Sequence, residues 1–209
     1  HHDPRCAPRK SEPANVVIVW TRVCVLPVIH ISWIRMLSKV LSGSTYGVSA
    51  YIVEVETHLE KGLPGFAIVG LPDNAIRESR ERISAAIRNS GFEFPLRRIT
   101  MNLAPADIRK EGSAFDVPMA IGILAATGQI EANVLQDYVM LGEVALDGTL
   151  RPVHGVLPIA LETRRMGIRG MLLPRENGKE AAMVSGVAVY PVSSLKEIAE
   201  FLNADHARL

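Results

Sequence analysis

The amino-acid sequence predicts an α/β domain of the two-layer α+β kind, and three observations lead to this fold class. Strand and helix signals alternate along residues 36–203. One Asp-Gly pair between two strand-like segments gives a strong hairpin signal. Apolar residues make up 48% of the 209 residues and charged residues 22%, which excludes intrinsic disorder, collagen and a coiled coil for the whole chain.

The first 35 residues differ in composition from the rest. They contain both cysteines and both tryptophans, with five basic and two acidic side chains, whereas residues 36–209 carry 18 basic and 20 acidic ones. Residues 16–34 are long enough to span a membrane, but an arginine, a proline and a histidine interrupt them, and a central arginine costs about 2.5–3.5 kcal/mol on insertion. We interpret residues 1–35 as a tag, a misassigned start or a disordered or apolar extension, with Met36 as the natural first residue.

Three strands are predicted in the first half of the domain. Residues 50–59 alternate in polarity and are rich in β-branched side chains, which is typical of a strand. Residues 65–69 are a short apolar run between two Gly-Leu-Pro turns, and we expect a buried strand there. Residues 98–103 are the third strand.

A helix is predicted between the second and third of these strands. Asp73 or Asn74 is its expected N-terminal cap, and the helix runs to about Asn89 with three isoleucines on one face. The other face is charged, and the i,i+4 spacing predicts pairing of Arg77 with Glu81 and of Glu78 with Arg82.

The second half begins with an unusually apolar helix at residues 115–127, which we expect to be central because it is apolar nearly all round. Strands at 138–146 and 149–153 flank Asp147-Gly148 as a hairpin. The remaining predicted elements are a helix at 155–166, a strand at 170–173, a short helix at 179–184, a strand at 188–192 and a last helix at 194–202.

Motifs for nucleotide hydrolysis and metal binding are missing from the sequence. The only Gly-Lys pair, Gly178-Lys179, has no glycine five positions before it, so it is not a phosphate-binding loop. Six histidines and two cysteines form no ligand-spaced cluster, and we expect no metal. The net charge of +1 gives no general attraction to nucleic acid or to a membrane. Since no cysteine follows Cys24, we expect a cytoplasmic protein.

Three long segments carry a family resemblance: residues 62–95, 102–130 and 141–161. They resemble the N-terminal, Mg-chelatase-like domain of the AAA+ ATPases of the ComM/YifB type, over residues 36–203. The resemblance implies a non-catalytic accessory domain whose partners are its own AAA+ module and neighbouring subunits in a hexameric ring. It further implies that the module uses ATP and Mg²⁺ to act on DNA, with branch migration in natural transformation as the family role. Residues 204–209 then begin the linker to that module.

A second, more distant resemblance is to the proteolytic domain of the Lon family. It implies the fold shared by Lon proteolytic domains, GHMP kinases and a domain of a small-subunit ribosomal protein. Lon needs a serine nucleophile and a lysine base within hydrogen-bond reach. The resemblance places Ala114 at the serine position and Leu157 at the lysine position, so we expect no catalysis. A diverged Ser–Lys peptidase that uses the adjacent Ser113 is the alternative.

For the remaining candidate residues we favour a structural role over a functional one. Asp116 is interpreted as an N-terminal cap or first-turn carboxylate rather than a catalytic acid. Glu143 is expected to anchor loop backbone, and His154 to be a turn residue. Four arginines on the charged helix are candidates for contact with DNA phosphates, although we favour a solvated helix face or an interface with a neighbouring module: Arg77, Arg80, Arg82 and Arg88.

Overall fold

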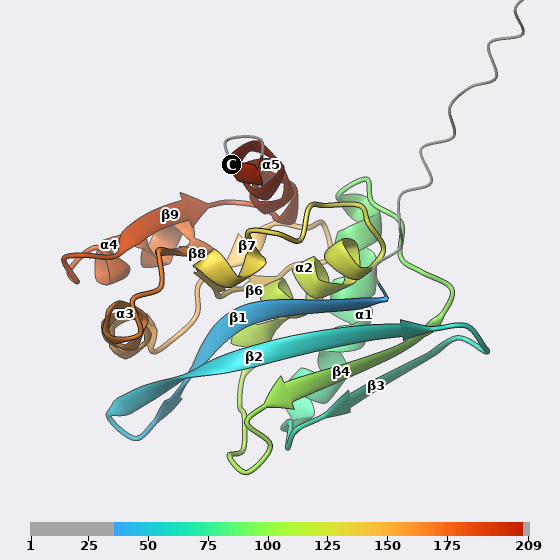
Figure 1. The fold of residues 1–209 in the computed structure, drawn as a ribbon, viewed down its shortest axis with the longest axis horizontal. Helices are drawn as coiled ribbons and strands as arrows, with labels where there is room; N and C mark the ends of the chain where they lie inside the picture. Colours follow the sequence, from blue (N-terminus) through green and yellow to red (C-terminus); the bar gives the residue numbers. More distant parts are fainter. Residues whose placement is uncertain (1–35, 207–209) are drawn as a thin grey trace, which may run out of the picture. The chain divides into compact units, whose positions relative to one another are not determined.

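A seven-stranded mixed sheet organises the protein in the computed structural model, which describes residues 36–206 (Figure 1). Across the sheet its strands are β3 (Gly65–Val69), β4 (Arg98–Ala104), β2 (Ser49–Glu60), β1 (Leu37–Tyr46), β5 (Tyr138–Met140), β8 (Gly170–Pro174) and β9 (Ala188–Val192). β2 is antiparallel to both β1 and β4, and the other neighbouring pairs are parallel. The sheet is therefore mostly parallel, as expected for the predicted α/β class, but the helices on its two faces make three layers where two were predicted.

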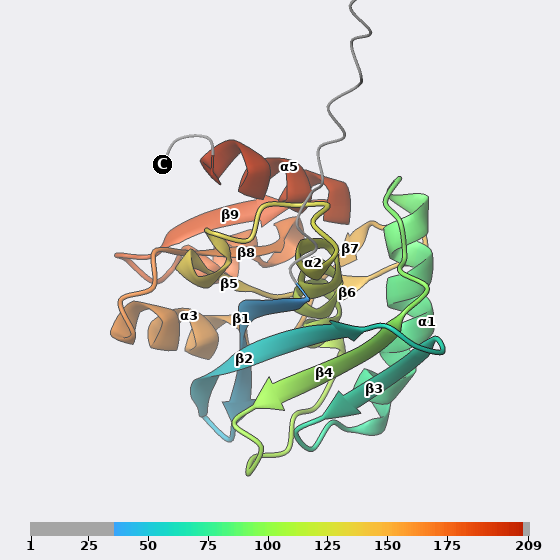
Figure 2. The same ribbon diagram turned by 45° about the vertical axis from the view of Figure 1, so that its right-hand side comes forward.

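Helices cover this sheet on both faces (Figure 2). They are α1 (Asn74–Asn89), α2 (Asp116–Ala126), α3 (Val156–Arg165), α4 (Gly178–Ala181) and α5 (Leu195–His206), with 3₁₀ turns at Ser113–Phe115, Leu135–Asp137 and Arg175–Asn177. α1, α2 and α5 share one apolar cluster with the sheet, while α3 and α4 pack on a second cluster. Successive residues of β5 show the division, since Met140 belongs to the first cluster and Val139 to the second.

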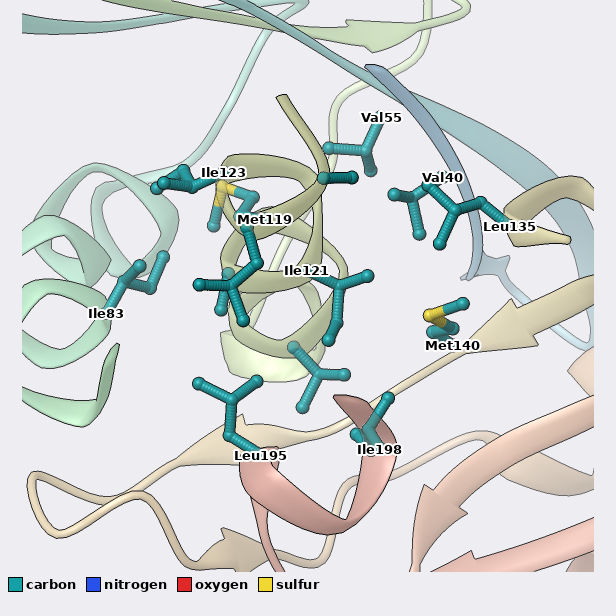
Figure 3. Packing of buried hydrophobic residues seen from close by; sticks show 14 of the residues in the cluster. Val40, Val55, Ile83, Met119, Ile121, Ile123, Leu135, Met140, Leu195 and Ile198 are labelled. Carbon is teal, nitrogen blue, oxygen red and sulfur yellow. The ribbon is translucent and has the colours of Figure 1, made fainter. Parts of the chain in front are cut away.

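The centre of the larger cluster is α2, as its composition predicted. Each of its residues is buried. Figure 3 shows its side chains reaching the strands, α1 and α5, and the labelled residues are Val40, Val55, Ile83, Met119, Ile121, Ile123, Leu135, Met140, Leu195 and Ile198. Polar groups at the ends of a helix that is buried on all sides cannot bind water, so they need hydrogen-bond partners in the protein. The residues next to α2 are therefore important for its stability.

Several predicted elements are confirmed and others are corrected. The helix at 74–89 has the predicted bounds, and the Asp73 carboxylate accepts a hydrogen bond from the backbone N–H of Ile76 at 2.8 Å. β3 was predicted to be buried but is the edge strand of the sheet and is partly exposed. The predicted strand 138–146 is interrupted at Gly142, whose φ of 152° turns the chain out of the main sheet.

After this interruption, β6 (Glu143–Val144) and β7 (Leu150–Arg151) form the predicted hairpin as a small separate sheet. β1 was not predicted at all. At the other end, α5 continues to His206, so it includes residues 204–206, which were expected to begin a linker. The predicted membrane-length stretch at 16–34 lies outside the described residues, and no helix within residues 36–206 is long and apolar enough to cross a membrane.

The closest approach between α2 and the sheet gives a test of this packing. A Cβ added at Gly122 would lie 2.4 Å from Thr57 Oγ1, so only glycine fits without a shift. We expect Gly122→Ala to lower the free energy of unfolding by about 1–3 kcal/mol, because overpacking forces the helix away from β2. Urea denaturation measures this change.

Gly65→Ala is the matched control, because the nearest atom to its added methyl is 3.8 Å away. We expect this control to change stability by less than about 0.5 kcal/mol. Equal effects of the two substitutions would contradict the close contact of α2 with β2.

Candidate functional site

The turn before α2 and the start of α3 meet at one apolar cluster. The backbone N–H of Gly142 donates to the carbonyl of Ala114 at 3.0 Å, which fixes the turn against the end of β5. Ala114 and Leu157 both pack, partly buried, on the cluster that includes Val139 and Val156. The two positions that the Lon resemblance singled out therefore pack on the same apolar cluster, and both side chains are hydrocarbon.

Ser113 lies in the 3₁₀ turn just before α2 and is partly exposed. The nearest lysine in sequence, Lys110, is buried, and its ammonium donates to the carbonyl oxygens of Gly70, at 3.2 Å, and of Pro105. Burial lowers the pKa of Lys110. Within residues 36–206, no lysine is hydrogen-bonded to the Ser113 hydroxyl. Lys110 instead joins the loop before α1 to the turn after β4.

An ion pair between Arg82 and Asp116 lies behind this turn. The Arg82 guanidinium donates from Nε to Oδ2 at 2.8 Å and from Nη2 to Oδ1 at 3.0 Å. The backbone N–H of Val144 also donates to Oδ2, at 3.4 Å. Asp116 has no exposed surface, and its carboxylate thus joins α1, α2 and β6 from the first turn of α2.

The electrostatics of this pair follow from its burial. Burial raises the pKa of Asp116 to about 6, while the hydrogen bonds and the charge of Arg82 oppose the rise. The Asp116 carboxylate in turn raises the pKa of Arg82. Arg82 was predicted to pair with Glu78 along its own helix, and this was wrong, because the buried carboxylate on α2 offers it a bidentate partner.

Glu143 and His154 lie on the hairpin side of the site. Glu143 was expected to anchor loop backbone, but its carboxylate pairs with Arg151 at 3.2 Å across the hairpin. His154 is exposed in the turn before Gly155. Within residues 36–206, no three His, Cys, Asp or Glu side chains lie together as metal ligands.

Two anchoring residues were missed by sequence reasoning. The Asn177 side chain accepts from the backbone N–H of Val153 and donates to its carbonyl, both at 2.9 Å. The Glu180 carboxylate accepts from the backbone N–H of Leu157 at 3.0 Å, in the first turn of α3. Such acceptors are typical of helix N-termini, but their separation of 23 or 24 residues leaves no local sequence signal.

The four candidate arginines do not form one surface. Arg82 points inward to Asp116. Arg77 lines a cavity of about 340 Å³ at the start of α1, together with Arg109. Arg80 and Arg88 line a different cavity, of about 170 Å³, beside β3. The arginines of α1 therefore lie in three different environments.

These features define the class of the protein. A mostly parallel α/β sheet, a short turn leading into a buried helix, and a hairpin leading into α3 make it a domain of the Lon-like fold. The model of the family described as subunit ChlI of Mg-chelatase matches residues 55–177, and the chain belongs to this family.

Individual relatives agree with the family. The chain is 43% identical to competence protein ComM of Haemophilus influenzae over 167 residues, which cover 80% of this chain and 33% of that protein. It is 42% identical to the uncharacterized protein YifB of Escherichia coli over 171 residues, covering 82% of this chain and 34% of YifB. A Lon protease of Chloroflexus aurantiacus is 29% identical over 164 residues, covering 72% of this chain and 20% of the protease. The chain thus spans about a third of the length of ComM and YifB.

The ion pair predicts a large effect of its arginine on stability. We expect Arg82→Ala to lower the free energy of unfolding at neutral pH by about 3 kcal/mol, because it leaves the Asp116 carboxylate buried without its cation. Arg80→Ala is the control on the same helix, since Arg80 is half exposed and its pair with Glu81 is 3.9 Å long. We expect less than about 0.5 kcal/mol for the control. Similar losses for both variants in chemical denaturation would contradict a structural role for Arg82.

The pKa of Asp116 predicts a pH dependence of stability. Its value of about 6 in the folded chain exceeds the ordinary 3.8, so the folded chain binds this proton more tightly than the unfolded chain does. The tighter binding of this proton adds about 3 kcal/mol to the free energy of unfolding. This contribution is fully present below about pH 4 and is lost as the pH rises through 6.

Comparison with Asp116→Asn isolates this contribution from those of the other carboxyl groups. We expect the unfolding free energy of the natural chain to fall between pH 4 and pH 7 relative to that of the Asn variant, because asparagine does not titrate. Parallel pH profiles for the two chains would show that Asp116 has an ordinary pKa in the folded state.

Proposed function

We propose that this chain is a non-catalytic accessory domain of a Mg-chelatase-like AAA+ ATPase and that it acts through contact with other protein modules. The observation that carries the proposal is that the positions of the Lon serine and lysine are both apolar here. They are Ala114 and Leu157, which pack on one cluster. A methyl group cannot attack a carbonyl, and an isobutyl group cannot accept a proton. The membership in the ChlI family and the similarity to ComM and YifB support the rest.

The whole protein's activity is part of this proposal. The name of ComM describes it as a competence protein, and we extend to the parent of this chain a role in ATP-driven DNA processing during natural transformation. ATP and Mg²⁺ would be bound by the AAA+ module, because this sequence has no phosphate-binding loop. The partners would be that module and neighbouring subunits of a hexamer, in the cytoplasm.

The two alternative functions have less support. A peptidase based on Ser113 would need a free amine beside the hydroxyl, but the Lys110 ammonium is engaged by two backbone carbonyls. A DNA-binding module based on α1 would need its arginines on one surface, but Arg82 is turned inward. Glu78 and Glu81 further reduce the positive potential of the exposed face.

A serine-reactive fluorophosphonate probe distinguishes an accessory domain from a peptidase. We expect no covalent labelling of the full chain and no cleavage of casein, while a Lon protease treated in parallel provides the positive control. Mass spectrometry locates any label. A label on Ser113 that disappears in Ser113→Ala but persists in Ser84→Ala, a substitution on α1, would contradict the proposal.

A further inference from the structure

A cleft beside the edge of the sheet combines positive charge with apolar side chains. It is the cavity of about 170 Å³ between α1, the start of β3 and the loop before β4. We call it the arginine cleft; three arginines outnumber the one carboxylate in its lining, and the residues that define it are Arg80, Arg88, Arg97, Glu81, Phe66, Phe94 and Leu96. Figure 2 shows α1 and β3 on the same side of the domain. The cleft is distinct from the turn at Ser113 and from the ion pair of Arg82.

The arginines of the cleft are not all paired with carboxylates. Arg88 stacks on the Phe94 ring, with its guanidinium carbon 5.5 Å from the ring centroid. Among residues 36–206, no carboxylate lies within ion-pair distance of Arg88 or Arg97, and the pair of Arg80 with Glu81 is long and largely exposed. A guanidinium over the face of an aromatic ring keeps its N–H donors available, so the cleft can donate to an anionic group.

Apolar side chains surround these charges. Leu63, next to the lining residue Pro64, is 89% exposed, and Leu96 is 79% exposed. Exposed leucines close to a cleft are typical of surfaces that bind other proteins. The backbone of a nucleic acid offers nothing apolar to such side chains, whereas a peptide does.

Besides the positive charge and the apolar side chains, the cleft has a third feature, which is the neighbouring edge strand β3. β3 pairs only with β4 among the described residues, so the backbone groups on its other side are open to an added strand. Gly65 and Phe66, the first two residues of β3, also line the cleft. A peptide added to β3 would therefore run past the arginines, with alternate side chains directed to the same side.

The overall charge also favours a peptide over a nucleic acid. Residues 36–206 carry 17 Lys and Arg against 20 Asp and Glu, so the positive potential is local to the cleft. Long-range attraction of a polyanion needs a broad positive surface, whereas a few carboxylates need only a local one.

From this combination we infer that the arginine cleft and the edge of β3 bind an extended acidic peptide segment of a partner protein. Carboxylates at alternate positions pair with Arg80, Arg88 and Arg97, and the methylene groups of the same side chains contact Leu96, which lines the same cleft. The backbone of the segment pairs with β3. This inference deepens the proposed contact role and rests on it, because it specifies the chemistry of one partner.

The test uses a fluorescein-labelled octapeptide that alternates glutamate with valine and leucine, added to the full chain and followed by fluorescence anisotropy. We expect saturable binding that weakens with added salt. We also expect the same peptide with lysine in place of glutamate not to bind, and a version N-methylated at alternate amides to bind more weakly, because it cannot complete the added strand.

Two glutamine variants locate the site. We expect Arg97→Gln to weaken binding about tenfold, the loss of one charge-assisted hydrogen bond. Arg164→Gln is the matched control, since Arg164 is an exposed arginine on α3 that lines a different cavity, and we expect unchanged binding. Thermal unfolding of both variants checks that they fold.

Three results would overturn the inference. They are no binding at millimolar peptide, equal loss in the two variants, and tighter binding of a single-stranded oligonucleotide that is also lost in Arg97→Gln. The last result would assign the cleft to nucleic acid instead. None of the three affects the labelling test on Ser113, so failure of this inference is distinguishable from failure of the proposed non-catalytic role.

Discussion

A buried carboxylate costs several kcal/mol unless a cation and hydrogen bonds replace its water. Asp116 meets this constraint through the bidentate contact with Arg82 and a third bond from the backbone of Val144. These contacts fix α1, α2 and the hairpin relative to one another at the point where the chain enters its most buried helix. The turn that carries Ser113 and Ala114 is held in place by the same contacts, since it leads directly into Asp116.

The same ion pair lies beside the turn that the Lon resemblance singled out. The turn and the start of α3 both pack on one cluster, and the side chains that they place there, Ala114 and Leu157, are hydrocarbon. Backbone contacts such as that of Glu180 with Leu157 stabilise the start of α3 without contributing any reactive group.

Local patterns in the sequence predicted much of the fold. The cap at Asp73 and the isoleucine spacing defined α1, and the apolar run defined α2. β1 was missed because its inward positions include serines, whose hydroxyls find distant partners: Ser38 donates to the carbonyl of Gly122 at 2.7 Å and Ser42 to that of Met140 at 3.0 Å. The pairing of Arg82 with Asp116 could not be predicted either, because 34 residues separate them and a closer glutamate satisfied the helical rule. The partners of the candidate residues named from the sequence thus depended on the tertiary structure.

A double-mutant cycle between Arg82 and Asp116 measures most directly whether this ion pair holds the site together. The cycle compares the unfolding free energies of Arg82→Met, Asp116→Asn and the double variant at neutral pH. We expect a coupling free energy above about 1 kcal/mol, with the double variant no less stable than Arg82→Met, because removing both partners leaves no buried charge uncompensated. Additive effects of the two substitutions would contradict it.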